Sequence, residues 1–81
     1  MKTDDIFDAI ARIGRERLGW TGALSPEMRL IDDLKLDSVH LLTLAVEVEN
    51  RFRIALDEAD EAALETVGDL AAVVQRKLAL G

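Results

Sequence analysis

The sequence predicts an all-α fold, a bundle of three main helices and one short helix with a long loop between the first and the second. Three segments carry apolar residues at the spacing of one helical face, and each begins at a residue that can cap a helix. Between the first two segments, residues 19–36 are rich in turn-forming residues and show no sustained periodicity. Because 81 residues can build one modest core, we expect a single domain over residues 1–81.

The first helix is expected to begin at Thr3, whose side chain can cap it, with acidic residues in the first turn where the helix dipole favours them. Its buried face is predicted from apolar residues at helical spacing. These are Ile6, Phe7, Ile10 and Ile13. Gly14 lies inside this helix and costs about 1 kcal/mol relative to alanine, so we expect the last turn, toward Leu18, to be loose.

The long loop runs from Gly19 to Leu36. Ser25 followed by Pro26 is typical of the start of a single helical turn. So long a loop in so small a domain is unusual unless it is functional or packed down, and we expect its apolar side chains to do the packing. These side chains are Leu24, Met28, Leu30, Ile31, Leu34 and Leu36.

The second helix is predicted over residues 38–52, where no proline or glycine interrupts a very broad apolar stripe. Asp37 and Ser38 both favour helix starts, because a short side-chain oxygen can accept from the unpaired N–H groups of the first turn. The Ser38 hydroxyl would therefore lie at the positive end of a helix dipole, where a phosphate is favoured. Three residues of the stripe are expected in the core, namely Leu42, Ala45 and Phe52.

Two more helices are predicted in the C-terminal third. Residues 57–64 form at most a short helix, and its acidic side chains are expected to face solvent. These are Asp57, Glu58, Asp60 and Glu61. Thr66 then starts the last helix, with Asp69 three residues on in a capping-box pattern. Its buried stripe consists of Val67, Leu70, Val73, Val74 and Leu78.

Charge and composition narrow the class of function. The formal net charge of −6 disfavours nucleic acid and anionic membranes, and it favours protein partners with basic docking surfaces. No long uncharged apolar run is present and the first residues do not resemble a signal peptide, so we expect a cytoplasmic protein. The absence of cysteine excludes disulfides, zinc–thiolate sites and cysteine nucleophiles. Any thiol chemistry would therefore require a cofactor.

Several motifs follow the predicted helices in order. They are the stretch from Asp33 to Val39, Phe52 at the end of the second helix, Leu56-Asp57-Glu58, and the stretch from Leu64 to Leu70. Together they resemble the acyl carrier protein family along essentially the whole chain. The Asp37-Ser38 pair alone is a weak signal, but its position in a four-helix pattern with Thr66-Val67-x-x-Leu70 is much more specific.

The resemblance implies a four-helix bundle of acyl-carrier type and a prosthetic group. A phosphopantetheinyl transferase would attach 4′-phosphopantetheine from coenzyme A to Ser38, and the thiol of the arm would hold an acyl or aminoacyl group as a thioester. Asp37 would help to present the serine to the transferase and its magnesium. The chain would then be a carrier and not an enzyme, with no catalytic residue and no metal site of its own.

The resemblance also implies a partner surface on the exposed side of the second helix. The residues expected to contact partners there are Val39, His40, Thr43, Val46 and Glu47. The implied partners are the transferase, an acyl- or aminoacyl-loading ligase and downstream transferases, and the chain is expected to be a monomer. A sheltered acyl chain would enter between the second helix and the short one.

Three departures from the family pattern indicate a specialised carrier. Lys35 stands where a glycine is common, His40 stands where an acidic residue is common, and the usual proline before Asp57-Glu58 is absent. These changes dilute the acidic patch that basic enzyme surfaces would read. Fatty acyl, polyketide and amino acid cargo all stay open.

Other interpretations of the same residues stay open. Asp37 and Ser38 could form a plain N-cap, and the chain could be an acidic helical interaction module that uses no prosthetic group. A hydrolase is disfavoured because consecutive residues at a helix start cannot easily aim Asp37, Ser38 and His40 at one another, and because a small bundle lacks a sheltered pocket. A calcium site in the acidic cluster is disfavoured because the glycine and distal glutamate of such a loop are missing.

Overall fold

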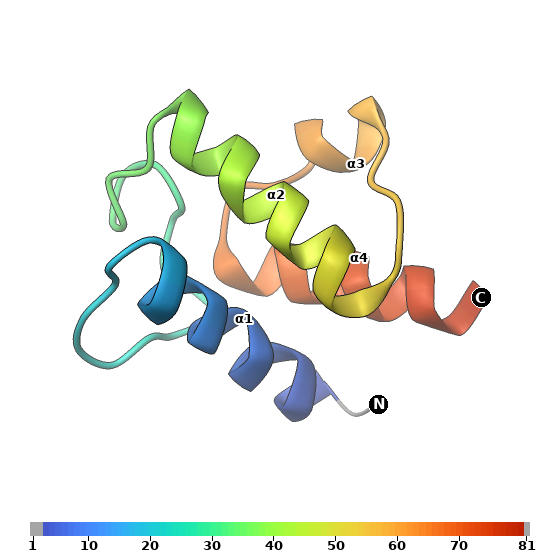
Figure 1. The fold of residues 1–81 in the computed structure, drawn as a ribbon, viewed down its shortest axis with the longest axis horizontal. Coiled ribbons are helices and arrows are strands. Elements are labelled where there is room, and N and C mark those ends of the chain that lie inside the picture. The colour runs from blue at the N-terminus through green and yellow to red at the C-terminus, as the bar shows by residue number, and fades with distance from the viewer. Residues whose placement is uncertain (1–2, 81) are drawn as a thin grey trace.

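The computed structural model describes residues 3–80, with side chains from Asp4 onward. Its helices in that range are α1 (Thr3–Arg17), α2 (Ser38–Phe52), α3 (Glu58–Ala62) and α4 (Val67–Leu80). In Figure 1, α1 and α2 run in opposite directions, α4 packs against α1, and the short α3 lies on the other side of α2 from α1. The predicted all-α bundle of three main helices, one short helix and a long loop is confirmed. No helix in the described range has the length and apolarity needed to cross a membrane.

The core lies where α1, α2 and α4 meet. Its largest fully buried side chains are Ile6, Ile10, Leu30, Leu44, Val48, Val67, Leu70 and Val74. Each such aliphatic side chain stabilises the fold by about 1.5–3 kcal/mol through burial. The predicted buried positions Ala45 and Phe52 are confirmed, whereas Phe7 and Leu78 are partly buried at the edge of the core.

The N-terminus of α4 is held by its own cap and by the long loop. The Asp69 N–H donates to Thr66 Oγ1 and the Thr66 N–H donates to Asp69 Oδ2, both at 3.1 Å, so the predicted capping box is confirmed. The N–H groups of Val67 and Gly68 donate to the carbonyls of Met28 and Pro26 at 3.0 and 2.9 Å. The loop thus satisfies donors that the first turn of a helix leaves unpaired.

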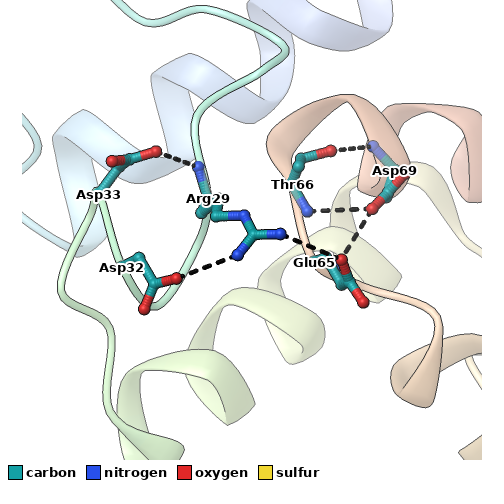
Figure 2. A network of polar contacts seen from close by, with 6 residues as sticks. All are labelled: Arg29, Asp32, Asp33, Glu65, Thr66 and Asp69. Carbon is teal, nitrogen blue, oxygen red and sulfur yellow. Dashed lines mark hydrogen bonds and ion pairs between the residues drawn. The ribbon is translucent and has the colours of Figure 1, made fainter.

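Arg29 extends this attachment through its side chain, as Figure 2 shows. Its guanidinium lies 3.2 Å from Asp32 Oδ2 and 3.7 Å from Glu65 Oε2. Its backbone N–H donates to Asp33 Oδ2 at 2.7 Å. The loop is therefore fixed to the start of α4 before it reaches α2.

The apolar side chains of the loop do not all pack. Leu30 and Leu36 are buried, and Leu24, Met28 and Leu34 are partly buried against the core. Ile31 is 59% exposed, so its predicted packing is wrong. Leu30 is buried beside the bridge that pairs Arg29 with Thr66, whereas Ile31 lies in the turn of residues 30–34 that follows, with its side chain exposed to solvent. Ser25 and Pro26 form the predicted single turn, in which the Met28 N–H donates to the Ser25 carbonyl at 3.2 Å.

Gly14 is required by a close approach of Trp20. A Cβ atom at Gly14 would lie 1.8 Å from Cε3 of the Trp20 ring. The Gly14 carbonyl also accepts from the N–H groups of Leu18 and Trp20, at 3.0 and 3.1 Å. The loose last turn expected of α1 stays a prediction, and the Thr3 side chain that was expected to cap this helix lies outside the described residues.

The short helix α3 contains a buried carboxylate. Asp60 is 5% exposed and accepts from Arg76 Nη2 and Lys77 Nζ of α4, both at 2.8 Å. The expectation that all four acidic residues of this segment face solvent is therefore wrong for Asp60 and holds for the other three. The hydrogen bond from Lys77, followed by that from the Asp57 N–H, lowers the pKa of Asp60 from 3.8 to about 2. Asp60 also completes a capping box with Asp57, the N-cap of α3.

Candidate functional site

Ser38 is exposed and is the first residue of α2, as predicted. Asp37 is the N-cap, and its Oδ1 accepts from the His40 N–H at 2.8 Å. The capping role therefore falls to Asp37 and leaves the serine hydroxyl unused. Within residues 3–80 no hydrogen bond involves the Ser38 side chain. An exposed hydroxyl without a partner is open to covalent modification.

Asp37 and His40 contact each other, so the expectation that these residues of the helix start cannot easily aim at one another is wrong for this pair. His40 Nδ1 lies 3.0 Å from Asp37 Oδ1. The two residues are three positions apart, the spacing that brings side chains together at a helix start. The hydrogen bond from the His40 N–H is the main cause that lowers the pKa of Asp37. The expected exposure of His40 is confirmed, and no contact joins its imidazole to Ser38 among the described residues.

An apolar cavity of about 400 Å³ opens beside Ser38. It lies between α2 and the segment from α3 to α4, which is where a sheltered acyl chain was expected. Its lining consists of Leu30, Ser38, Leu41, Leu42, Leu44, Ala45, Glu61, Leu64 and Leu70. The place of this cavity was expected from the sequence, but none of its lining residues was predicted. Leu41 lies near the start of α2, and Leu64 lies between α3 and α4.

The cavity and the serine together fit phosphopantetheine. The Ser38 hydroxyl reaches solvent at a helix N-terminus, where the dipole favours a phosphate. The cavity next to it offers apolar surface with one acidic side chain, Glu61. A long group with a charged phosphate at one end and an apolar load at the other matches this arrangement.

The exposed side of α2 carries an apolar stripe. Val39, Leu42 and Val46 are 67%, 62% and 43% exposed, and they follow one another at helical spacing. The prediction that Leu42 lies in the core is therefore wrong. The apolar face of α2 is wider than the surface that the core can bury. The part that contains Leu44 and Val48 is buried, and the part that contains Leu42 is exposed to solvent. We call Val39, Leu42 and Val46 the α2 stripe.

The other predicted partner residues of α2 have different surroundings. His40 is exposed and paired with Asp37. The Thr43 hydroxyl donates to the Val39 carbonyl at 3.0 Å, so it is already used within the helix. Glu47 is partly buried, with Oε1 3.7 Å from Arg17 Nε of α1. In the described residues no group of three or more histidine, cysteine, aspartate or glutamate residues is arranged to hold a metal ion.

Comparison with known proteins identifies the family. The family model described as "Phosphopantetheine attachment site" matches residues 8–74. An acyl carrier protein of Thermotoga maritima is 36% identical over 76 residues, which cover 93% of this chain and 94% of that protein. The chain belongs to the acyl carrier protein family. It is a carrier protein whose prosthetic group is phosphopantetheine, so both of these predictions are confirmed.

Relatives within the acyl carrier protein family include specialised carriers. The meromycolate extension acyl carrier protein of Mycobacterium tuberculosis is 34% identical over 90% of this chain and 64% of that protein. The acyl carrier protein MbtL of a Mycobacterium species is 48% identical over 64% of this chain and 58% of that protein. A crystal structure of a T. maritima acyl carrier protein has a TM-score of 0.87 over 99% of this chain and 94% of that one, with 21% identity, which confirms the fold. Carrier proteins of this family work with biosynthetic enzymes.

Proposed function

We propose that Ser38 is the residue to which 4′-phosphopantetheine is attached, and that the chain is a specialised carrier of acyl groups. The observation that carries this proposal is the exposed, unpartnered hydroxyl of Ser38 at the start of α2, on the rim of an apolar cavity. When bound, the arm supplies the thiol that holds the cargo as a thioester. The residues of the chain position the serine and catalyse nothing.

Asp37 keeps the first turn of α2 in place for the transferase. Its pKa is lowered by the hydrogen bond from the His40 N–H, so its carboxylate stays ionised at neutral pH. That carboxylate is exposed next to the serine, where it suits the magnesium that the phosphopantetheinyl transferase brings. Asp37 is a positioning residue in this proposal.

The aliphatic lining of the cavity favours an apolar acyl cargo over an amino acid. Its lining is aliphatic except for Ser38 and Glu61, so a chain of methylene groups would be removed from water there. Hydrogen exchange of the holo protein with and without a loaded decanoyl chain tests this assignment. Slower amide exchange of residues 54–64 in the loaded protein than in the unloaded protein supports this assignment. Equal exchange rates of these residues in the two samples contradict it.

Two features support a specialised role. Lys35 has φ 59°, a left-handed conformation that glycine adopts more readily, so this chain departs there from the residue that the backbone favours. The α2 stripe offers apolar contact to partners, with His40, Thr43 and Glu47 along its edges and no acidic residue in the first turn of α2. We infer that a loading ligase and downstream transferases dock on it, and that residues 1–81 act as one cytoplasmic carrier domain that does not bind nucleic acid or membranes.

The mass of the intact chain tests the attachment site. The protein is incubated with coenzyme A, magnesium and a promiscuous phosphopantetheinyl transferase, beside the variants Ser38→Ala and Ser25→Ala. Ser25 and Ser38 are the two serines of the chain, so Ser25→Ala is the matched control. One added phosphopantetheinyl group is expected on the native protein and on Ser25→Ala, and none on Ser38→Ala.

Addition to Ser38→Ala would place the site elsewhere. No addition to a folded native sample would favour the interaction module that works without a prosthetic group. In that case the α2 stripe would bind its partner with equal affinity in the native protein and in Ser38→Ala.

A further inference from the structure

A groove between α1 and the C-terminal half of α2 carries positive charge. The charged side chains that line it are Arg12, Glu16, Arg17, Glu47, Arg51 and Arg53. Four arginines against two glutamates give the groove a net charge of +2 in a chain whose net charge is −6. The groove is therefore positively charged, whereas the chain as a whole is negatively charged.

Most of these arginines are free to bind a partner. Arg17 lies 3.7 Å from Glu47, a contact in which both side chains are partly exposed. Within residues 3–80, Arg12, Arg51 and Arg53 form no ion pair. By contrast, Arg76 and Lys77 of α4 both contact Asp60. The groove therefore holds three exposed guanidinium groups that take part in no ion pair within residues 3–80.

Arg53 occupies an unfavourable backbone conformation. It follows the last residue of α2 with φ 55° and ψ 50°, and its N–H donates to the Glu49 carbonyl to end the helix. Glycine or asparagine would take this left-handed position more readily than arginine. Helix termination therefore does not explain the choice of arginine at this position.

The groove continues the α2 stripe in the direction away from Ser38. After Val46, the next position on the same face of the helix is Asn50, which lines the groove, and Arg53 directly follows the last residue of the helix. A protein that lies along α2 would meet apolar side chains near Ser38 and then arginines near the end of the helix. Long polyanions are less suitable because the rest of the chain is strongly acidic.

We propose that the groove docks an acidic patch on a partner enzyme, with the α2 stripe contacting the apolar surface next to that patch. The surface of the partner that meets the C-terminal end of α2 would then be acidic. The partner would need this negative charge to recognise the carrier. This inference rests on the proposed carrier function, because it takes the partner to be an enzyme that reaches toward Ser38. The binding itself needs no prosthetic group and can be measured without one.

Binding of acetylated hexaglutamate, followed by amide chemical shifts at low salt, tests the proposal. We expect shifts concentrated on residues 9–17 and 47–53, and an affinity that falls as salt is raised. In the double variant Arg51→Gln/Arg53→Asn the affinity should fall about fivefold. Lys35→Asn is the matched control, because Lys35 is also an exposed cation with a left-handed backbone, at φ 59°, and its loss should change affinity less than about twofold.

Three outcomes would overturn the proposal: equal loss of affinity in Lys35→Asn and the double variant, shifts centred outside the groove, or tighter binding of hexathymidylate than of hexaglutamate. The same titration of Ser38→Ala should give the native affinity. Failure of the mass experiment with normal hexaglutamate binding would remove the proposed attachment at Ser38 and leave the groove. Failure of the peptide to bind with normal phosphopantetheinylation would remove the groove and leave the carrier.

Discussion

Asp60 Oδ2 and Lys77 Nζ lie 2.8 Å apart and join the short helix α3 to α4. Arg76 adds a second contact to the same carboxylate at 2.8 Å. No apolar residue of α3 itself is buried, so this buried carboxylate is the main contact that holds α3 to the rest of the bundle. Because α3 precedes Leu64 at the cavity wall, this contact also holds one side of the cavity beside Ser38.

Asp60→Asn should lower the thermal stability of the protein and loosen α3. The amide would leave Arg76 and Lys77 without a buried anion and would weaken the cap at Asp57. Glu58→Gln is the control, because Glu58 is an exposed acid on the same helix. Thermal melts and hydrogen exchange of residues 57–64 measure the effect. Equal melting temperatures for the two variants would contradict the assigned role of Asp60.

The same residue predicts how stability depends on pH. The folded pKa of Asp60 is about 2, below the usual 3.8, so its stabilising contribution is present above about pH 4 and is lost as the pH falls toward 2. In urea unfolding between about pH 5 and about pH 2.5, the free energy of unfolding should fall less steeply in Asp60→Asn than in the native protein. Parallel slopes would show that the ion pair is not formed in solution.

Gly14→Ala should destabilise the protein even though alanine favours helices. The new methyl group would lie 1.8 Å from the Trp20 ring and force it out, at a cost of about 1–3 kcal/mol. Trp20 is the single tryptophan, so its fluorescence should shift toward the spectrum of an exposed indole. The double variant Gly14→Ala/Trp20→Ala is the control, and it should lose no more stability than Trp20→Ala alone.

Leu42→Ala and Leu44→Ala should differ sharply although they are two residues apart. Leu44 is fully buried, and its truncation should cost about 2–5 kcal/mol in urea unfolding. Leu42 is mostly exposed, and its truncation should change stability by no more than about 0.5 kcal/mol. Comparable losses in the two variants would place Leu42 in the core after all.

Thr66→Ala should cost about 1 kcal/mol by removing the acceptor for the Asp69 N–H at the start of α4. Thr66→Ser keeps a hydroxyl and should retain most of that stability. Urea unfolding of the two variants measures the difference. A loss in Thr66→Ser as large as in Thr66→Ala would attribute the effect to the methyl group instead of the cap.

Local signals in the sequence determined where the helices begin and which family the chain resembles. Asp37 and Thr66 cap α2 and α4 through hydrogen bonds to residues three positions on, and contacts of that range depend on nearby residues alone. For the same reason, the sequence alone indicates that the serine next to Asp37 lies at a helix start and is the candidate attachment site.

Only the tertiary structure decided which half of a broad apolar face is buried and which charges are paired. Leu42 and Leu44 both lie on the broad apolar face of α2. Packing of α2 in the bundle buries Leu44 and leaves Leu42 mostly exposed. The burial of Asp60 depends on Arg76 and Lys77, more than a dozen residues along the chain, and the need for Gly14 depends on where Trp20 folds back. These contacts join residues that are not neighbours on the face of one helix. Their physical cause therefore lies in how the helices and the loop pack together.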